Sequence, residues 1–204
     1  MSEYPDHSPN IDVGWYSEAS FSPPRPLCPT PGNWHTVDIQ ATEAEVIDMV
    51  AGMIRGHQPD IVLETGTSRG YMTLTISAAL EANSHGYIHT FEPDSQTMAE
   101  AAGLWADNPE VSGRIFANEA ESMASPWTGP PIDFAWHDSL TDLRQPEFEF
   151  FLPHYSDRAV VCFHDTAPRF GDWSDGLRAK LAEEGFSHLD WPSPRGVIIA
   201  TRNG

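Results

Sequence analysis

From residue 42 onward, short apolar segments alternate with longer segments in which apolar residues recur at helical spacing. Short apolar segments between turn-forming residues are typical of buried strands, and the longer spacing is typical of amphipathic helices. The pattern predicts strands over 60–65, 87–92, 113–118, 132–137 and 158–164, and helices over 42–56, 68–82, 94–107, 119–125 and 143–153. Thr42 and Glu45 have the spacing of a capping box. Strands that alternate with helices in this way form a parallel sheet with helices on both faces.

The C-terminal part of the chain departs from this alternation. A helix over 174–184 stops at Gly185, and strands follow over 186–190 and 196–201 with only 191–195 between them. We expect these two strands to be antiparallel, because a parallel crossover needs about a dozen residues. The predicted fold is α/β, a Rossmann-like doubly wound seven-stranded sheet, mostly parallel with an antiparallel C-terminal hairpin strand.

The first 33 residues differ in composition from the rest of the chain. They contain seven of the eighteen prolines, which excludes a regular helix or a central strand. Trp15, Tyr16 and Phe21 are too apolar for a purely solvated tail, so we expect this arm to pack on the body or on a neighbouring subunit. The predicted organisation is a Pro-rich arm over 1–33 and a single domain over 34–204, with a homo-oligomer formed through the arm.

Composition narrows the classes of partner. Eleven basic and thirty acidic residues leave a formal charge of −19, which repels nucleic acid and anionic membrane surfaces. Cys28 and Cys162 form neither a disulfide framework nor a zinc spacing. The sequence shows no signal peptide or membrane-spanning segment, so we expect a cytoplasmic protein that acts on a small molecule.

Polar residues between two apolar segments at 61–74 mark a candidate ligand site. Ligands of doubly wound sheets bind outside the carboxyl ends of the strands, where residues 64–70 are expected to lie. Gly66 and Gly70 permit close backbone approach, and a helix that starts at Ser68 offers free amides. The alternative is a tight strand-to-helix turn that binds nothing.

The acid in this stretch discriminates between cofactors. The carboxylate of Glu64 would repel the phosphates of a dinucleotide, whereas it suits a cationic ligand such as S-adenosylmethionine. Glu92 ends the next strand, 28 residues later, where nucleotide sites place an acid on the ribose hydroxyls. The alternative for Glu92 is a surface acid that follows a strand.

The stretch LETGTSRGYMTL resembles the first motif of class I S-adenosylmethionine-dependent methyltransferases, and within them the catechol and macrocin O-methyltransferase-like branch. The resemblance spans about residues 40 to 201, with motifs at 64–71, 92, 133–138 and 163–166. It implies a cofactor site formed by Glu64, Gly66, Thr67, Ser68, Gly70, Glu92, Glu119 and Asp138. Met72 stands where the branch often has a serine for the methionine carboxylate, and Ser68 or Thr73 could substitute.

Two further strand ends carry acids and histidines at the same expected edge. These residues, His137, Asp138, His164 and Asp165, should converge there. The resemblance implies a magnesium site formed by Asp138, His164 and Asp165. Because imidazole is a poor magnesium ligand, the alternatives are that the metal is manganese or another transition ion, or that His164 does not bind the metal itself but contacts one of its ligands. The alternative is that both acids cap turns and His164 is a buried structural histidine.

Methyl transfer to a hydroxyl requires a positioned and deprotonated acceptor, and a divalent metal would assist both. Candidate bases are Asp138, His137 and His35, because Thr141 stands where the catechol-type enzymes carry a lysine. Trp34, Phe170 and Trp173 could form an acceptor wall, or could be ordinary core aromatics.

The leading hypothesis is an O-methyltransferase that acts on a hydroxyl of a sugar, a glycan or an aromatic natural product. The alternatives are a cofactor-binding protein without turnover, or a nicotinamide-dependent oxidoreductase, which the missing Tyr-x-x-x-Lys relay disfavours.

Overall fold

The computed structural model describes residues 17–18, 34–36 and 42–202 of the chain. Its strands are β1 (Ser17–Glu18), β2 (His35–Thr36), β3 (Ile61–Thr65), β4 (Tyr87–Phe91), β5 (Ile115–Asn118), β6 (Ile132–His137), β7 (Tyr155–His164), β8 (Phe186–Trp191) and β9 (Val197–Arg202). Its helices are α1 (Ala44–His57), α2 (Tyr71–Asn83), α3 (Ser95–Ala106), α4 (Pro109–Ser112), α5 (Arg144–Phe151), α6 (Trp173–Glu183), and the short 3-10 helices η3 (Leu152–His154) and η4 (Pro168–Phe170).

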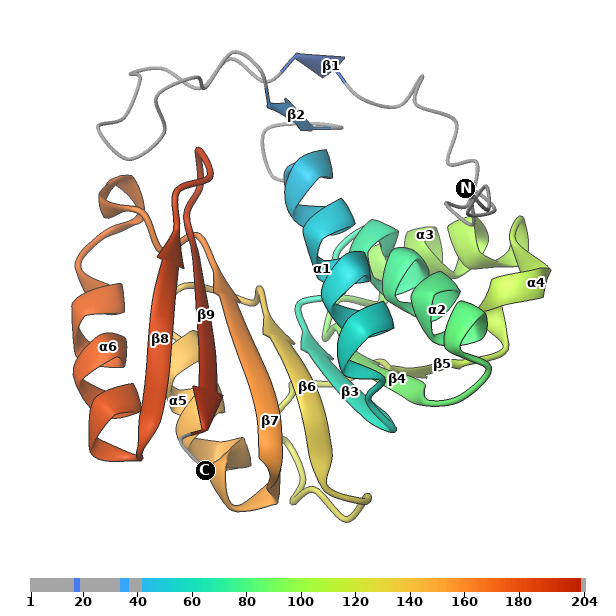
Figure 1. Ribbon diagram of the computed structural model, residues 1–204. Coiled ribbons are helices and arrows are strands. Elements are labelled where there is room, and N and C mark those ends of the chain that lie inside the picture. Colours follow the sequence, from blue (N-terminus) through green and yellow to red (C-terminus); the bar gives the residue numbers. More distant parts are fainter. Residues whose placement is uncertain (1–16, 19–33, 37–41, 203–204) are drawn as a thin grey trace, which may run out of the picture.

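The main sheet has seven strands in the order β5-β4-β3-β6-β7-β9-β8. The central strand β3 pairs in parallel with β4 and β6, and β7 pairs in parallel with β6. Strand β9 runs antiparallel to both β7 and β8. The predicted fold, mostly parallel with an antiparallel C-terminal hairpin, is confirmed. The carboxyl ends of the parallel strands therefore share one edge, at the top of Figure 1.

Helices cover both faces of the sheet, with α1 and α2 on one face and α5 and α6 on the other (Figure 1). Successive strand residues point to opposite faces, so each buried strand contributes to two cores. Val62 and Trp136 belong to the core beneath α1 and α2, whereas Leu63 and Ala135 belong to the core beneath α5 and α6. This double burial explains why β3 and β6 are continuous apolar segments rather than alternating ones.

Three local predictions are wrong. Residues 119–125 form turns instead of a helix, and Ser122 within them donates a hydrogen bond to Glu147. Helix α2 begins at Tyr71 with Gly70 as its N-cap, because Ser68 has a left-handed φ of 48°. Helix α1 has no side-chain cap, because the hydroxyl of Thr42 donates to Asp138 instead.

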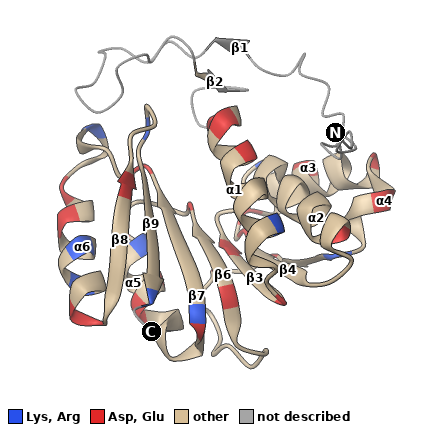
Figure 2. Ribbon diagram, viewed as in Figure 1, with Lys and Arg blue, Asp and Glu red and all other residues tan. Residues whose placement is uncertain are grey.

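Acidic and basic positions are interspersed along α6, as Figure 2 shows. Lys180 pairs with Glu183 and Glu184 along the helix. Such exposed pairs contribute little to stability. In the part of the chain that the structure describes, no helix has the length and apolarity that a membrane crossing requires.

The predicted arm over 1–33 lies outside the described residues, apart from Ser17 and Glu18. These two residues form β1 and pair antiparallel with β2. The aromatic residues singled out in the arm, Trp15, Tyr16 and Phe21, are not described, so its packing stays a prediction.

Candidate functional site

Glu64 is fully buried near the carboxyl end of β3. The hydroxyls of Thr73 and Thr90 donate to its Oε2 at 2.5 and 2.6 Å. Its Oε1 is buried and has no hydrogen-bond partner among the described residues. Burial raises the pKa of Glu64 to about 8, against the lowering effect of the two threonines. A cation placed beside Oε1 would supply the missing partner and stabilise the carboxylate.

Gly66 and Gly70 are required by the packing of the protein itself. A Cβ at Gly66 would lie 2.4 Å from the carbonyl oxygen of Asp138, and a Cβ at Gly70 would lie 2.6 Å from Nε1 of Trp105. Both glycines have left-handed φ angles, 85° and 79°. The indole of Trp105 donates to the carbonyl of Gly70 at 3.2 Å. The two glycines thus let the loop after β3 pack closely against the end of β6 and against α3. The sequence did not indicate this role.

Glu92 follows β4 and is connected to the β3 loop. Its Oε2 accepts a hydrogen bond from the amide of Ser68 at 3.1 Å, and its Oε1 accepts one from the amide of Asp94 at 3.2 Å. Thr67 is buried, and its hydroxyl lies 2.5 Å from that of Thr90. The structure therefore brings the predicted cofactor residues of β3 and β4 to one edge of the sheet.

Two other predicted cofactor contacts have different surroundings. Glu119 is exposed directly after β5, at the outer end of the same edge. Thr73, considered as a substitute for the missing serine, donates its hydroxyl to Glu64. Thr73 thus orients the buried acid.

Asp138, His164 and Asp165 converge as predicted. One potential ligand atom from each lies within 4.8 Å of the others. Asp165 has a left-handed φ of 56° just after β7, and Asp138 follows β6. This is the donor set from which the metal site was predicted.

Two arginines already bind these carboxylates. Nη2 of Arg144 donates to Oδ1 of Asp138 at 2.9 Å and to Oδ2 of Asp165 at 3.0 Å. Nε of Arg195 donates to Oδ1 of Asp165 at 2.6 Å, and its Nη2 donates to Oδ2 at 3.0 Å. Both arginines are buried. The three residues therefore do not form an open cation site in this arrangement.

His164 connects the same cluster to the start of α1. It donates from Nδ1 to the carboxylate of Asp138, at 3.0 and 3.1 Å, and from Nε2 to Oε2 of Glu43 at 2.8 Å. Burial opposes its charge, but Asp138, Asp165 and Glu43 outweigh burial and raise its pKa to about 10. His164 is therefore a buried imidazolium held by acids, the alternative that the sequence left open.

Sequence analysis missed Glu43, Arg144 and Arg195. Arg144 is the first residue of α5, where the helix dipole disfavours a positive charge, so an acidic partner could have been expected. Glu43 and Arg195 carried no comparable signal, because 152 residues separate them and the amide of Arg195 meets Oε1 of Glu43 only in the folded chain.

His137, predicted as a base, is fully buried beneath α5. Its Nδ1 lies 3.1 Å from the hydroxyl of Thr65, and its Nε2 lies 2.9 Å from the hydroxyl of Tyr155. With both ring nitrogens engaged, it has no atom to offer an acceptor, and this geometry contradicts a role as base. The side chain of His35, the other histidine candidate, lies outside the described residues.

The aromatic residues of the predicted acceptor wall have partners within the protein. Trp34 packs partly buried against the core beneath α1 and α2. The guanidinium of Arg195 lies 4.9 Å from the ring centre of Phe170, and that of Arg144 lies 5.4 Å from that of Trp173. Phe170 and Trp173 therefore border the arginine cluster.

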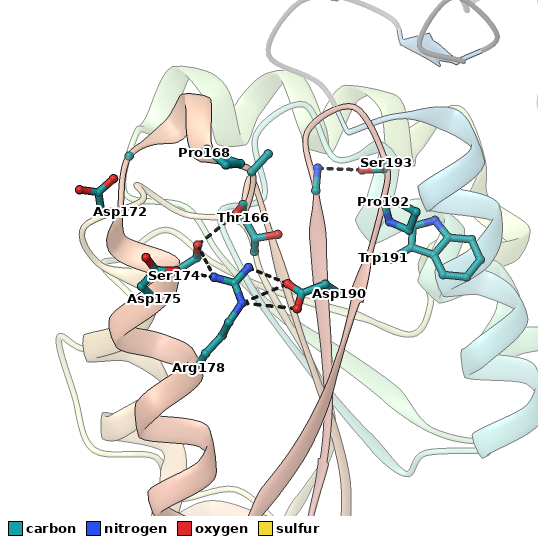
Figure 3. A pocket seen from close by; sticks show the side chains of 13 residues that line it. Thr166, Pro168, Asp172, Ser174, Asp175, Arg178, Asp190, Trp191, Pro192 and Ser193 are labelled. Atoms are coloured by element: carbon teal, nitrogen blue, oxygen red, sulfur yellow. Dashed lines mark hydrogen bonds and ion pairs between the residues drawn. The ribbon is translucent and has the colours of Figure 1, made fainter. Parts of the chain in front are cut away.

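A cavity of about 240 Å³ lies beside this cluster. The segment after Asp165 and the turn between β8 and β9 form its walls, and Figure 3 shows Arg178 bonded to Ser174 and Asp190 there. Because β9 and β8 lie beyond β7 in the sheet order, the cavity is displaced from Glu64 toward the outer strands. Phe170 and Trp173 of the predicted acceptor wall do not line this cavity, whereas their neighbours Pro168, Gly171 and Ser174 do.

A family model described as a methyltransferase domain matches residues 63–166, just over half of the chain. The match includes the strand ends that carry Glu64, Glu92, Asp138 and Asp165. No curated protein sequence matches the chain significantly.

Similar solved structures share the fold. SAH-bound methyltransferase PaMTH1 from Podospora anserina has a TM-score of 0.72 and 16% identity over 81% of each chain. The O-methyltransferase from Bacillus cereus in complex with SAH has a TM-score of 0.70 and 17% identity, over 81% of this chain and 84% of that one. The SAM-bound O-methyltransferase TomG from Streptomyces achromogenes, involved in tomaymycin synthesis, has a TM-score of 0.65 and 18% identity, over 81% and 82%.

Proposed function

Because the chain belongs to the methyltransferase-domain family, we propose that it is an S-adenosylmethionine-dependent O-methyltransferase acting on a hydroxyl of a small molecule. The observation that carries the proposal is the unpartnered, buried Oε1 of Glu64 at the edge where Glu92 also lies. An acid with a missing partner fits a cofactor that carries an ammonium and a sulfonium.

The residues present fit this cofactor. Glu64 would face its positive charge, and Glu92, already fixed by the amide of Ser68, would accept hydrogen bonds from the ribose hydroxyls. When bound, the cofactor supplies the methyl group on its sulfonium. The chain has to hold the acceptor oxygen in line with that methyl group and exclude water.

Asp138 is the residue of the second cluster best placed to meet an acceptor. Its side chain is 16% exposed, compared with 7% for Asp165 and 0% for His164. It can accept a hydrogen bond from the acceptor hydroxyl while Arg144 and His164 hold it in place. No step of this proposal passes through a metal, because both carboxylates of the predicted metal site are bonded to arginine.

The acceptor class is proposed on two grounds. The formal charge of −19 disfavours nucleic acid as the acceptor. TomG acts in the synthesis of tomaymycin, which is consistent with a natural product, a sugar or a glycan as the acceptor.

Titration calorimetry of S-adenosylmethionine into wild type and Glu64→Gln tests the cofactor. We expect binding to wild type and at least about tenfold weaker binding to the variant, since a hydrogen bond to a charged group contributes about 1.5 to 3 kcal/mol and about 1.4 kcal/mol corresponds to a factor of ten. Arg158→Ala is the matched control, because Arg158 pairs with Asp133 away from the strand ends that hold the site. Absence of any binding to folded wild type would refute the proposal.

A cofactor-binding protein without turnover is the second candidate. The carboxylate of Asp138 is already bonded to Thr42, Arg144 and His164, and Thr141 stands where related enzymes carry a lysine. This candidate predicts binding without methylated product when labelled cofactor is incubated with a broad panel of sugars, phenols and catechols. Product from any acceptor would exclude it.

A homo-oligomer formed through residues 1–33 stays part of the proposal, as does a cytoplasmic location. The apolar side chains of Trp15, Tyr16 and Phe21 support the oligomer. Light scattering on the full chain and on a chain that starts at residue 34 would test it. A monomeric mass for the full chain would contradict it.

A further inference from the structure

The guanidinium of Arg144 lies between the two carboxylates of the predicted metal site, those of Asp138 and Asp165. Its Nη2 bridges Asp138 and Asp165, its Nε donates to the carbonyl of Ser139 at 3.0 Å, and its Nη1 donates to the carbonyl of His164. The residue is only 2% exposed, and its guanidinium faces the ring of Trp173. A side chain with all three nitrogens bonded and almost no exposure is fixed rather than passing through the site.

Arginine already pairs with both carboxylates of the predicted metal site. Asp138 pairs with Arg144, and Asp165 pairs with both Arg144 and Arg195. Glu43 accepts hydrogen bonds from Nε2 of His164 and from the backbone amide of Arg195. A divalent ion would have to displace this buried guanidinium of Arg144 from between the two carboxylates.

We infer that Arg144 replaces the divalent ion that this type of site would hold, so that cofactor binding and methyl transfer need no metal. The inference rests on the proposed function for the reaction itself. The arginine supplies a fixed positive charge, which holds the carboxylates of Asp138 and Asp165 side by side at the edge of the sheet. Arg144 is thus a positioning residue, and the acceptor would meet Asp138.

Manganese binding tests this inference without reference to methyl transfer. Mn²⁺ is titrated into wild type, Arg144→Ala and Arg158→Ala, and the free ion is followed by electron paramagnetic resonance. We expect no stoichiometric binding to wild type or to Arg158→Ala, and binding at least about tenfold tighter to Arg144→Ala, because removal of the guanidinium leaves Asp138 and Asp165 without the cation that bridges them. Arg158→Ala removes an arginine paired with Asp133, outside the cluster, and so controls for loss of a charge.

Two results would overturn the inference. One is stoichiometric Mn²⁺ binding to wild type that is lost in Asp138→Asn. The other is a folded Arg144→Ala variant, judged by circular dichroism, that binds Mn²⁺ no better than wild type. If Arg144→Ala does not fold, Arg144→Gln, which keeps a polar side chain, takes its place, and the wild-type titration still decides the first result.

The cofactor titration separates this inference from the proposed function. Wild type that binds S-adenosylmethionine equally well with and without ethylenediaminetetraacetate supports both. Cofactor binding that is lost with the chelator and restored by Mg²⁺ overturns the role of Arg144 and leaves the methyltransferase proposal standing. If wild type binds no cofactor and Mn²⁺ still binds only to Arg144→Ala, the proposed reaction is refuted, whereas the replacement of the metal by Arg144 still holds.

Discussion

The backbone of Asp138 packs directly against Gly66. A Cβ at position 66 would lie 2.4 Å from the carbonyl oxygen of Asp138 and 2.6 Å from its carbonyl carbon. This contact joins the loop after β3, where the cofactor is proposed to bind, to the loop after β6, where the acceptor is proposed to bind. The separation of these two loops thus depends on the absence of a side chain at position 66.

Gly66→Ala should lower the free energy of unfolding by about 2 to 4 kcal/mol, from overpacking against fixed backbone and from a left-handed φ. Urea unfolding followed by circular dichroism measures this change. Gly103→Ala is the control, since no atom lies within 4 Å of its added Cβ in α3. That variant should be stabilised by about 0.5 to 1 kcal/mol. Equal effects at both positions would contradict the packing argument.

The stability of the protein without cofactor should fall between pH 5 and pH 7 because of Glu64. Its pKa is about 8 in the folded protein and near 4.5 when exposed, so the folded state holds a proton that the unfolded state releases in this range. The contribution is about 3 kcal/mol between pH 5 and pH 7, from about 1.4 kcal/mol per pH unit.

Urea unfolding of wild type and Glu64→Gln at several pH values tests this expectation. As pH rises from 5 to 7, the free energy of unfolding of wild type should fall relative to that of Glu64→Gln, because glutamine does not titrate. A difference that is independent of pH would show that Glu64 is ionised in the folded protein.

Cofactor binding at pH 7 should release up to one proton from Glu64. A cation beside Oε1 would stabilise the carboxylate and lower its pKa from about 8 toward its usual range. Calorimetry in buffers of different ionisation enthalpy measures the proton count. Glu64→Gln should show no release from this site, and the same release in both proteins would place the proton elsewhere.

Tyr155→Phe should lower the free energy of unfolding by about 1 kcal/mol without weakening cofactor binding. The change removes the buried hydroxyl next to Nε2 of His137, a bond 2.9 Å long. Thermal unfolding and cofactor titration of the same preparation give both quantities. Weaker cofactor binding with unchanged stability would contradict a purely structural role for this bond.

Cys162 should be inert to thiol reagents in the folded protein. It is fully buried in β7, and burial raises its pKa well above that of an exposed thiol, so the reactive thiolate is absent. Ellman's reagent on a Cys28→Ser variant isolates this residue. We expect reaction only as the protein unfolds, with a rate that rises with urea, whereas rapid reaction under native conditions would contradict the burial.

The linear pattern of the chain was enough to predict the strands, their mostly parallel direction and the antiparallel hairpin. These features follow from burial on two faces and from the length of each connection, which are local properties. The placement of Glu64, Glu92, Asp138, His164 and Asp165 at one edge followed for the same reason, since every parallel strand ends on that side. The wrong helix over 119–125 lay where the turn depends on a contact of Ser122 with Glu147, 25 residues away.

Only the tertiary structure decided what the residues at that edge do. Gly66 packs against the backbone of Asp138, and Gly70 packs against the indole of Trp105. The hydroxyl of Thr42 donates to Asp138, and Arg144 donates to both Asp138 and Asp165. Each of these roles depends on a partner brought close by folding, and hydrogen bonds and charge pairs act over a few ångströms regardless of sequence separation. Hydrophobic periodicity contains no information about such pairings, so the chain alone predicted where the site lies, and the fold determined which charges it holds.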